Sequence, residues 1–265
     1  MAPLWRSAKN PVGTGINMNW KIAAPVAACL TLGAIHPAMA QHHHWGYSGE
    51  SAPQNWGKLD PEFATCASGK SQSPIDVGKS EKGDPTPIRL DYKKGTAEIL
   101  NNGHTVQVNY QPGSSLTLDG RSFELKQFHF HAPSENTVNG KHFALEGHLV
   151  HEDQDGNLAV IAVMFREGPA NPFIASLWKA IPAREGEKNS LSEPLSVLRM
   201  LPRERHYYLF TGSLTTPPCS EGVRWLLLQK AMTASKAQID AFAQAVGFAN
   251  NRPVQPLNAR QVVSQ

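Results

Sequence analysis

Residues 127–153 read QFHFHAPSENTVNGKHFALEGHLVHED and hold five of the chain's eleven histidines. We interpret residues 122–131 as one β-strand and residues 141–151 as a second, because their apolar and polar residues follow strand patterns. Asn139-Gly140 between them is a typical turn signal. A hairpin of these two strands is therefore the element around which the rest of the chain is expected to be organised.

Polar side chains of this hairpin are expected to share one face of the sheet. Side chains two positions apart on a strand point the same way, so His129 shares a face with His131, and Glu146 with His148. If the strands pair antiparallel, the two sets can meet. Three neutral imidazoles on a rigid sheet leave a fourth tetrahedral position open, which is typical of a catalytic zinc rather than a structural one.

The third histidine strengthens this interpretation, because a lone His-x-His on a strand is more often a half-exposed pair than a metal site. Gln127 and Glu146 each stand two residues before a proposed ligand, and metal-bound histidines usually donate their second ring N–H to such groups. His151 does not share the parity of Glu146 and His148. We interpret His142 and His151 as surface or core residues.

Residues 1–40 have the features of a secretory signal peptide. They contain Arg6, Lys9 and Lys21 and no acidic residue, and an uncharged apolar run is followed by the cleavage motif Ala38-Met39-Ala40. The run is too short and wrongly flanked for a membrane span. Cleavage after Ala40 predicts a catalytic domain over residues 41–265 and a periplasmic location, or secretion where no outer membrane exists.

Two points about this segment stay open. A start at Met18 instead of Met1 gives a signal of more ordinary length. The sequence Val26-Ala27-Ala28-Cys29 also resembles a lipoprotein cleavage box, but Cys29 lies in the middle of the apolar run, so cleavage after Ala40 is favoured.

Removal of the signal changes the charge balance, because the chain has 25 basic and 22 acidic residues and the signal carries only basic ones. The mature chain is formally neutral and has no basic patch that would indicate nucleic acid as a partner. Its cysteines are Cys66 and Cys219. In an exported chain an even pair predicts a disulfide, worth roughly 4–5 kcal/mol on the loop-entropy model, with two buried free thiols as the alternative.

Further strands and three helices are expected along the chain. The other strands are predicted over residues 88–92, 97–100, 105–110, 115–118, 158–166, 206–211 and 223–229. Helices are predicted over residues 171–180, from Ser192 through Leu201, and from the capping-box motif at Ser235 to a stop at Gly247.

Nine motifs, taken together, resemble the α-class carbonic anhydrases of the bacterial exported kind. They are HWGY (44–47), QSPID (72–76), NNGH (101–104), QFHFH (127–131), SENTVNG (134–140), EGHLVH (146–151), GSLTTPPC (212–219), EGVRW (221–225) and NRPVQPLNAR (251–260). The resemblance covers nearly the whole mature chain. It implies a mainly β single domain with short peripheral helices around a large, twisted, mostly antiparallel sheet of about ten strands.

The resemblance implies zinc-dependent, reversible hydration of carbon dioxide to bicarbonate and a proton. Zinc lowers the pKa of its bound water, and the resulting zinc hydroxide attacks carbon dioxide. The family's zinc ligands match His129, His131 and His148. Thr215 and Glu135 match the pair that orients the hydroxide. His104 matches the proton shuttle, because an imidazole accepts and releases protons near neutral pH.

Other positions take their roles from the resemblance alone. The groups that orient the ligands match Gln127, Glu146 and the backbone carbonyl of Asn250. The apolar wall for carbon dioxide matches Val150, Val160, Leu214, Val223 and Trp225. The polar side that holds the connecting waters matches Tyr47, Asn102 and Gln107, and the polar residue beside the substrate matches Thr216. Cis bonds are expected at Ser73-Pro74 and Pro217-Pro218.

The resemblance also implies partners. These are carbon dioxide and bicarbonate, with inhibitory anions and sulfonamides as further ligands, and a homodimer is compatible with it. Gln107 and Phe210 differ from the groups that other family members carry at these positions. We expect these differences to adjust the properties of the site without abolishing its activity.

Two alternatives remain at this point. His129-x-His131-x-x-x-Glu135 also fits the first metal motif of cupin barrels, in which the glutamate is a ligand, although the following glycine falls too early and no second motif follows. Related domains that have lost zinc act in binding rather than catalysis. Here the three ligands, Thr215 and Glu135 are all present, which favours an enzyme.

Overall fold

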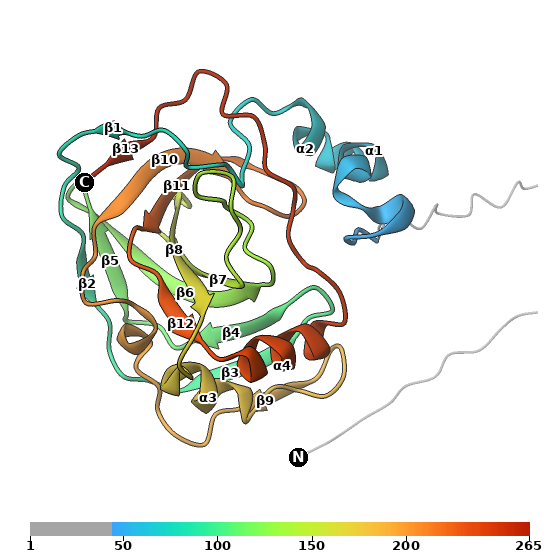
Figure 1. The fold of residues 1–265 in the computed structure, drawn as a ribbon, viewed down its shortest axis with the longest axis vertical. Helices are drawn as coiled ribbons and strands as arrows, with labels where there is room; N and C mark the ends of the chain where they lie inside the picture. The colour runs from blue at the N-terminus through green and yellow to red at the C-terminus, as the bar shows by residue number, and fades with distance from the viewer. Residues whose placement is uncertain (1–43) are drawn as a thin grey trace, which may run out of the picture. The chain divides into compact units, whose positions relative to one another are not determined.

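The computed structural model describes residues 44–265. The proposed signal peptide, with its alternative start at Met18 and its lipoprotein box at Cys29, lies outside the described residues. Within them the chain forms a large mixed sheet with short helices at its edges (Figure 1).

The strands are β1 (Glu81–Lys82), β2 (Arg89–Asp91), β3 (Ala97–Asn101), β4 (Val106–Tyr110), β5 (Ser115–Leu118), β6 (Arg121–His131), β7 (Leu145–Glu152), β8 (Leu158–Glu167), β9 (Lys188–Ser190), β10 (Tyr207–Ser213), β11 (Glu221–Leu228), β12 (Met232–Ala234) and β13 (Val263–Ser264). The α-helices are α1 (Trp56–Leu59), α2 (Thr65–Ser68), α3 (Pro172–Trp178) and α4 (Lys236–Val246). Short 3-10 turns are η1 (Gly49–Ser51), η2 (Pro53–Asn55), η3 (Pro61–Phe63) and η4 (Val197–Met200).

The main path of the sheet runs in the order β1-β13-β10-β11-β8-β7-β6-β4-β3-β9, with β12 beside β8 and with β5 between β6 and β2. Most neighbouring strands are antiparallel. The parallel pairs among the described strands are β1 with β13, β11 with β8, and β12 with β8. The predicted mainly β fold with a mostly antiparallel sheet is confirmed, and the sheet is mixed rather than purely antiparallel.

Strand β8 lies at the centre and is buried on both faces, as its continuous apolar sequence predicts. Ile161 and Val163 belong to a large apolar core on one face, which also contains Phe173 of α3 and Phe242 of α4. Its alternate residues, such as Val160, belong to a smaller core on the other face. The sheet therefore separates a large helix-covered core from a second face where polar groups can gather.

A β-bulge in β6 decides which of its side chains face each side. The register with β7 shifts between Leu125 and Gln127, so Lys126 is the extra residue. Before the shift, Leu125 faces the large core, and after it Phe128 and Phe130 do. Bulges re-aim side chains in this way. The shift turns Gln127 and the two histidines that follow it at alternate positions toward the opposite face.

The helix predictions were confirmed at two places and wrong at one. In α4 the capping box is formed, because Ser235 Oγ accepts from Gln238 N and Gln238 Oε1 accepts from Ser235 N, and Gly247 ends the helix with φ 84°. The helix expected from Ser192 is absent from the described structure, which has only η4 there. Its backbone is held extended at Leu195, whose N–H and C=O both bond to Gly95.

The disulfide between Cys66 and Cys219 is present and joins positions separated by 153 residues. It links α2 to the loop that follows β10. The expected cis bonds at Ser73-Pro74 and Pro217-Pro218 are also present, and Ala132-Pro133 is a third that was not expected.

His151 is a buried core residue, as its parity predicted. Its Nδ1–H donates to Ala159 O at 3.2 Å, so its Nε2 accepts from the Tyr92 hydroxyl at 2.6 Å. Burial lowers the pKa of His151 from 6.5 to about 4. Between pH 6.5 and about pH 4 the folded protein therefore keeps this ring neutral, whereas an unfolded chain would protonate it.

This burial predicts a pH-dependent loss of stability. Because the folded pKa is lower than the unfolded one, the contribution is complete above pH 6.5 and is lost as pH falls toward 4. A shift of this size corresponds to about 3 kcal/mol. We expect His151→Gln to flatten this part of the pH profile of the free energy of unfolding, measured by urea denaturation. The exposed His142→Gln should retain the wild-type slope, and equal slopes in all three proteins would contradict the assignment.

Candidate active site

The antiparallel pairing of β6 and β7 brings the predicted histidines together. His129 lies directly opposite His148, and His131 lies opposite Glu146. The ring centroids are 5.0 Å apart for His129 and His131, and 4.6 Å apart for His131 and His148. The hairpin geometry expected from strand alternation is confirmed. His142 is exposed, away from this cluster.

One nitrogen of each ring is held by a neighbouring acceptor. His129 Nδ1 donates to Gln127 Oε1 at 2.8 Å, and His148 Nε2 donates to Glu146 Oε1 at 2.9 Å. His131 Nδ1 donates to the backbone carbonyl of Asn250 at 2.7 Å. The three partners are those expected from the sequence. Such contacts fix the tautomer and the orientation of a ligating ring.

The remaining ring nitrogens form a donor set suited to one metal ion. Ligand atoms of His129, His131 and His148 all lie within 4.8 Å of one another. His131 Nε2 is buried and has no hydrogen-bond partner within residues 44–265. A buried polar atom without a partner is costly, and a bound cation removes that cost. The three residues therefore fit a metal with an open coordination position.

Burial keeps these imidazoles neutral, which metal binding requires. Burial lowers the pKa of His129 and of His148 well below the ordinary value, and the neighbouring histidines lower both further. The pKa of His131 is also lowered by burial, although its contacts with Asn250 and Glu146 oppose the shift.

Glu146 is held by a second ring of contacts that the sequence analysis missed. Its Oε2 accepts from the backbone N–H groups of Glu135 and Asn136, at 2.7 and 2.9 Å, and its Oε1 accepts from Asn136 Nδ2 at 2.7 Å. Burial raises the pKa of Glu146, while these bonds oppose the shift. Asn136 is fully buried, and a buried amide inside the SENTVNG motif is the signal that could have identified it.

Glu135 lies beside the cluster and is fully buried. Its Oε2 is 3.5 Å from His131 Nε2, and its Oε1 accepts from the backbone N–H of Arg252 at 2.9 Å. Burial raises the pKa of Glu135 to about 8, opposed by the Arg252 amide and by a hydrogen bond with the Thr215 side chain. The group of possible ligands contains the histidines and not Glu135, which is unlike the cupin arrangement.

The five residues predicted as an apolar wall all belong to the smaller core or pack against it. Buried members are Val160, Val223 and Trp225, and partly buried members are Val150 and Leu214. The Trp225 ring lies 4.8 Å from the His148 ring at an interplanar angle of 80°. Phe210 also stacks on Trp225, with the ring centroids 6.0 Å apart. The wall therefore adjoins the histidine cluster.

His104 lies at the predicted turn before β4. Its ring stacks on Trp45 with a centroid distance of 3.8 Å and is 5.7 Å from the ring of the exposed His44. Burial lowers the pKa of His104, and His44 lowers it further, while Glu185 opposes both. The Trp45 contact was not expected from the sequence.

Polar side chains line the strand between this turn and the cluster. Asn102 Nδ2 donates to Gln107 Oε1 at 3.4 Å, and Gln107 lies directly opposite His129 in the sheet. Burial raises the pKa of Tyr47, and the nearby Glu135 raises it further. Thr216 is half-buried in the loop after Thr215.

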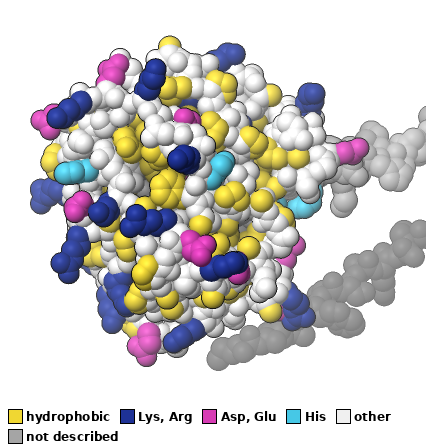
Figure 2. All heavy atoms as spheres, in the orientation of Figure 1, with side chains coloured by type: hydrophobic (Ala, Val, Ile, Leu, Met, Phe, Trp, Pro, Cys, Tyr) yellow, Lys and Arg dark blue, Asp and Glu magenta, His cyan; other side chains and the backbone are white. Residues whose placement is uncertain are grey.

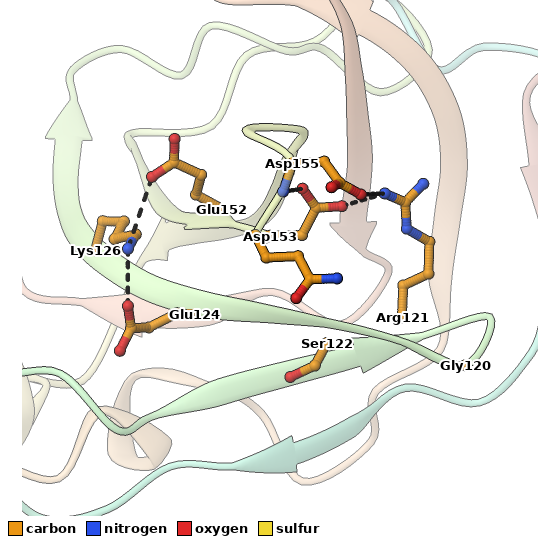
Figure 3. A pocket seen from close by; sticks show the side chains of 9 residues that line it. Gly120, Arg121, Ser122, Glu124, Lys126, Glu152, Asp153 and Asp155 are labelled. Carbon is orange, nitrogen blue, oxygen red and sulfur yellow. Dashed lines mark hydrogen bonds and ion pairs between the residues drawn. The ribbon is translucent and has the colours of Figure 1, made fainter.

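A hollow of about 550 Å³ near the beginning of β6 is a different feature (Figure 3). Both of its basic residues are paired with acidic ones. Lys126 pairs with Glu124 at 2.7 Å, and Arg121 pairs with Asp153 and Asp155. Figure 2 likewise shows Lys and Arg side chains interspersed with Asp and Glu on the visible face. Neither feature adds reactive groups to the histidine cluster.

Comparison with known proteins gives one consistent result. Residues 51–265 match the family described as eukaryotic-type carbonic anhydrase. A carbonic anhydrase of Pectobacterium carotovorum is 48% identical over 91% of this chain and 97% of its own length. One of Neisseria gonorrhoeae is 45% identical over 91% and 95%. The α-carbonic anhydrase of Thermovibrio ammonificans in complex with the inhibitor sulfanilamide superposes with a TM-score of 0.82 at 46% identity, over 83% and 99%.

Within the described residues, none of the helices is both long and apolar enough to cross a membrane.

The ring contacts predict how zinc binding responds to mutation. Gln127→Ala removes the acceptor of His129 Nδ1 and should weaken zinc binding roughly 10–100-fold. His148→Ala removes a ligand and should weaken it further. Competition titration against a chromophoric chelator measures both. His142→Ala, on the same hairpin but away from the cluster, should bind zinc as the wild type does. Unchanged affinity in His148→Ala would exclude this site.

Proposed function

Because the chain belongs to the eukaryotic-type carbonic anhydrase family and is a carbonic anhydrase, we propose that it interconverts carbon dioxide and bicarbonate at the three-histidine site with zinc as its metal. The observation that carries this proposal is the convergence of three neutral imidazoles whose other nitrogens are all held by acceptors. Family membership excludes the cupin alternative. The three histidines that are placed to bind a metal, together with Thr215 and Glu135, favour an enzyme over the binding-only alternative.

His129 and His131 would hold zinc through Nε2, and His148 through Nδ1. Zinc bound there supplies water acidified to near neutral pH, so that hydroxide is available to add to the carbon of carbon dioxide and one proton is released overall. Neutral ligands leave the positive charge of the ion undiminished, which favours that acidification. Burial of the rings supports this arrangement, because it lowers their pKa values.

Thr215 would orient the attacking oxygen. Its hydroxyl would donate to the carboxylate of Glu135, which already accepts from the Arg252 amide through Oε1. The positive charge of a bound zinc ion would favour the ionised form of that carboxylate. A hydroxyl whose proton is committed in this way can only accept from the next group. Thr215 would therefore accept a hydrogen bond from the attacking oxygen, and this contact would direct a lone pair of that oxygen toward carbon dioxide. Such preorganised contacts are a major source of rate acceleration.

The wall beside His148 would hold the substrate. Carbon dioxide is apolar and gains from contact with side chains such as Val160 and Trp225. Bicarbonate is charged and is disfavoured against the same surface, which favours its release. Thr216 supplies a polar contact on the substrate side.

His104 would accept the released proton through waters held along Tyr47, Asn102 and Gln107, and then pass it to solvent. The contact between Asn102 and Gln107, and the position of Gln107 opposite His129, support such a route. The lowered pKa of His104 makes the ring neutral, and therefore an acceptor, at neutral pH.

Ligands and location follow from the same proposal. The sulfanilamide complex of the Thermovibrio ammonificans enzyme supports inhibition of this chain by sulfonamides, and anions are expected at the same open position. Cleavage of the signal over residues 1–40 would release a periplasmic catalytic domain of residues 41–265. A homodimer stays a prediction.

Thr215→Ala is the direct test of the proposed chemistry. Loss of one preorganised group of this kind costs on the order of 100-fold in rate. We expect kcat/KM for carbon dioxide hydration to fall by about this factor while zinc content stays at one per chain, measured by stopped-flow assay and metal analysis. Ser220→Ala, which shortens an exposed side chain in the same loop, is the control. Near-normal activity in Thr215→Ala would remove the orienting role.

His104→Ala separates proton export from the chemical step. We expect kcat to fall while kcat/KM changes little, because kcat/KM reports the step at limiting carbon dioxide. Imidazole added as a buffer should restore much of the lost kcat, since it supplies the missing acceptor from solution. An equal loss in both parameters without rescue would show that His104, stacked on Trp45, has a structural role.

A further inference from the structure

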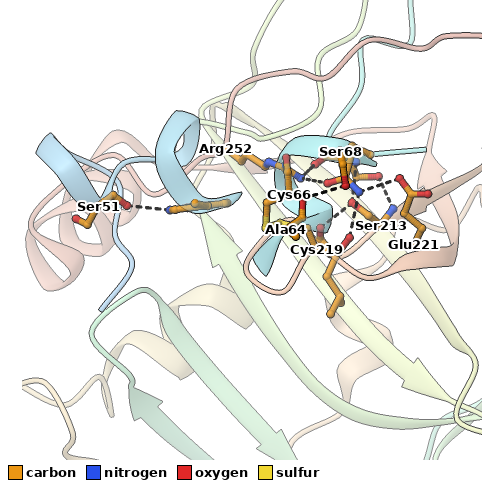
Figure 4. The surroundings of a disulfide bond; sticks show 12 residues. Ser51, Ala64, Cys66, Ser68, Ser213, Cys219, Glu221 and Arg252 are labelled. Atoms are coloured by element: carbon orange, nitrogen blue, oxygen red, sulfur yellow. Dashed lines mark hydrogen bonds between the residues drawn. A yellow bond between two sulfur atoms is a disulfide. The ribbon is translucent and has the colours of Figure 1, made fainter. Parts of the chain in front are cut away.

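We propose that Arg252 is a positioning residue for catalysis. Its backbone N–H holds Glu135, and its guanidinium holds the segments to which the loop of Thr215 is fastened. This inference rests on the proposed function, because it assigns Arg252 a part in the alignment of Thr215 with Glu135. Arg252 is 2% exposed. Its surroundings are drawn in Figure 4.

The guanidinium of Arg252 joins three separate segments. Its NH1 group donates to Gln72 Oε1 at 2.9 Å and to Ser73 O at 2.8 Å, and its NH2 group donates to Cys66 O at 2.9 Å. It also lies over the ring of Trp56, at 5.6 Å from the centroid. Its partners are carbonyl oxygens and an aromatic face rather than a carboxylate. The buried guanidinium therefore holds neighbouring segments of the chain together instead of forming an ion pair.

Two of these segments are tied directly to the Thr215 loop. Gln72 Nε2 donates to Cys219 O at 3.0 Å, and Cys66 is bonded to Cys219 by the disulfide. Ser73 and Ser213 exchange two hydrogen bonds, in which each backbone N–H donates to the hydroxyl of the other residue, at 2.9 and 3.2 Å. Both ends of the segment that carries Thr215 are therefore fastened to residues that the guanidinium holds.

The approach of Ser73 to Ser213 is close enough to require glycine at position 212. A Cβ atom on Gly212 would lie 2.1 Å from Ser73 Oγ. The segment between α2 and β1, which contains Ser73, therefore packs directly against β10. The position of the Thr215 loop is therefore set by its disulfide and hydrogen bonds to Cys66, Gln72 and Ser73 as well as by its own sequence.

Arg252 also reaches the other member of the pair. Its backbone N–H donates to Glu135 Oε1 at 2.9 Å, and Glu135 is the proposed partner of the Thr215 hydroxyl. One residue thus holds Glu135 through its main chain and the Thr215 loop through its side chain. Burial lowers the pKa of Arg252 to about 10, which still leaves the guanidinium charged at neutral pH.

The experiment uses zinc-loaded, disulfide-intact protein and a double-mutant cycle. Arg252→Met removes the side-chain donors but keeps the backbone N–H. We expect kcat/KM per bound zinc to fall on the order of 10-fold, because displacements of about 1 Å from distant changes can cost up to about 100-fold. In the Thr215→Ala background the same substitution should cost less than about 2-fold, since residues that act as a unit are not additive.

Arg260→Met is the matched control. The Arg260 guanidinium also donates to three carbonyls, those of Leu257, Thr211 and Pro256, but none belongs to the Thr215 loop. It should lower stability without changing kcat/KM per zinc in either background. If Arg252→Met proves too unstable to purify, Arg252→Lys keeps the charge and some of the bonds and should show the same coupling at smaller size.

The outcomes separate the two levels of inference. Equal losses from Arg252→Met in the wild-type and Thr215→Ala backgrounds, or no loss per zinc, would overturn the positioning role while leaving the proposed function intact. Near-normal activity in Thr215→Ala alone would instead remove the orienting role of Thr215, and the role of Arg252 with it. Absence of carbon dioxide hydration by the zinc-loaded wild type would overturn the proposed function. A 10-fold loss that disappears in the Thr215→Ala background supports the inference.

Discussion

The pairing of β6 with β7, interrupted by the bulge at Lys126, is the constraint on which the site depends. Without the extra residue, the alternation that buries Leu125 would continue and turn the later histidines of β6 toward the large core. With it, Phe128 stays in that core and His129 faces its partner strand's His148 on the other side. Because of this one inserted residue, β6 contributes apolar side chains to the large core both before and after the bulge. The side chains that alternate with them after the bulge face the polar site.

Satisfaction of buried polar groups is the second principle of the site. Asn250 is an example, because each of these polar groups has a partner. Its backbone carbonyl accepts from His131 and its Oδ1 accepts from Ala132 N. Its Nδ2 donates to the carbonyls of His104 and Phe130. Each such bond offsets the cost of burying its members, so the network is stable only when complete. The histidines are therefore oriented before any metal binds.

Contacts of the same kind connect the short helices before β1 to the site. The short helices before β1 contribute little to the sheet, but Cys66 of α2 is joined to Cys219 and to Arg252 (Figure 4). These contacts bring a region far from the histidines in sequence to the loop of Thr215. Stability of the helical segment and geometry of the site are then properties of one connected structure.

The sequence by itself determined the hairpin, the histidine face and most strands, because alternation with period two is a local property. It also determined α4, whose caps lie within the helix and the residues that flank it. It did not determine the bulge at Lys126, since an extra residue in a ladder is defined only by the partner strand. Nor did it predict the extended backbone at Leu195, where bonds to Gly95 override an apparent helical spacing. The contacts of Arg252 likewise exist only after distant segments pack together, so only the tertiary structure decided them.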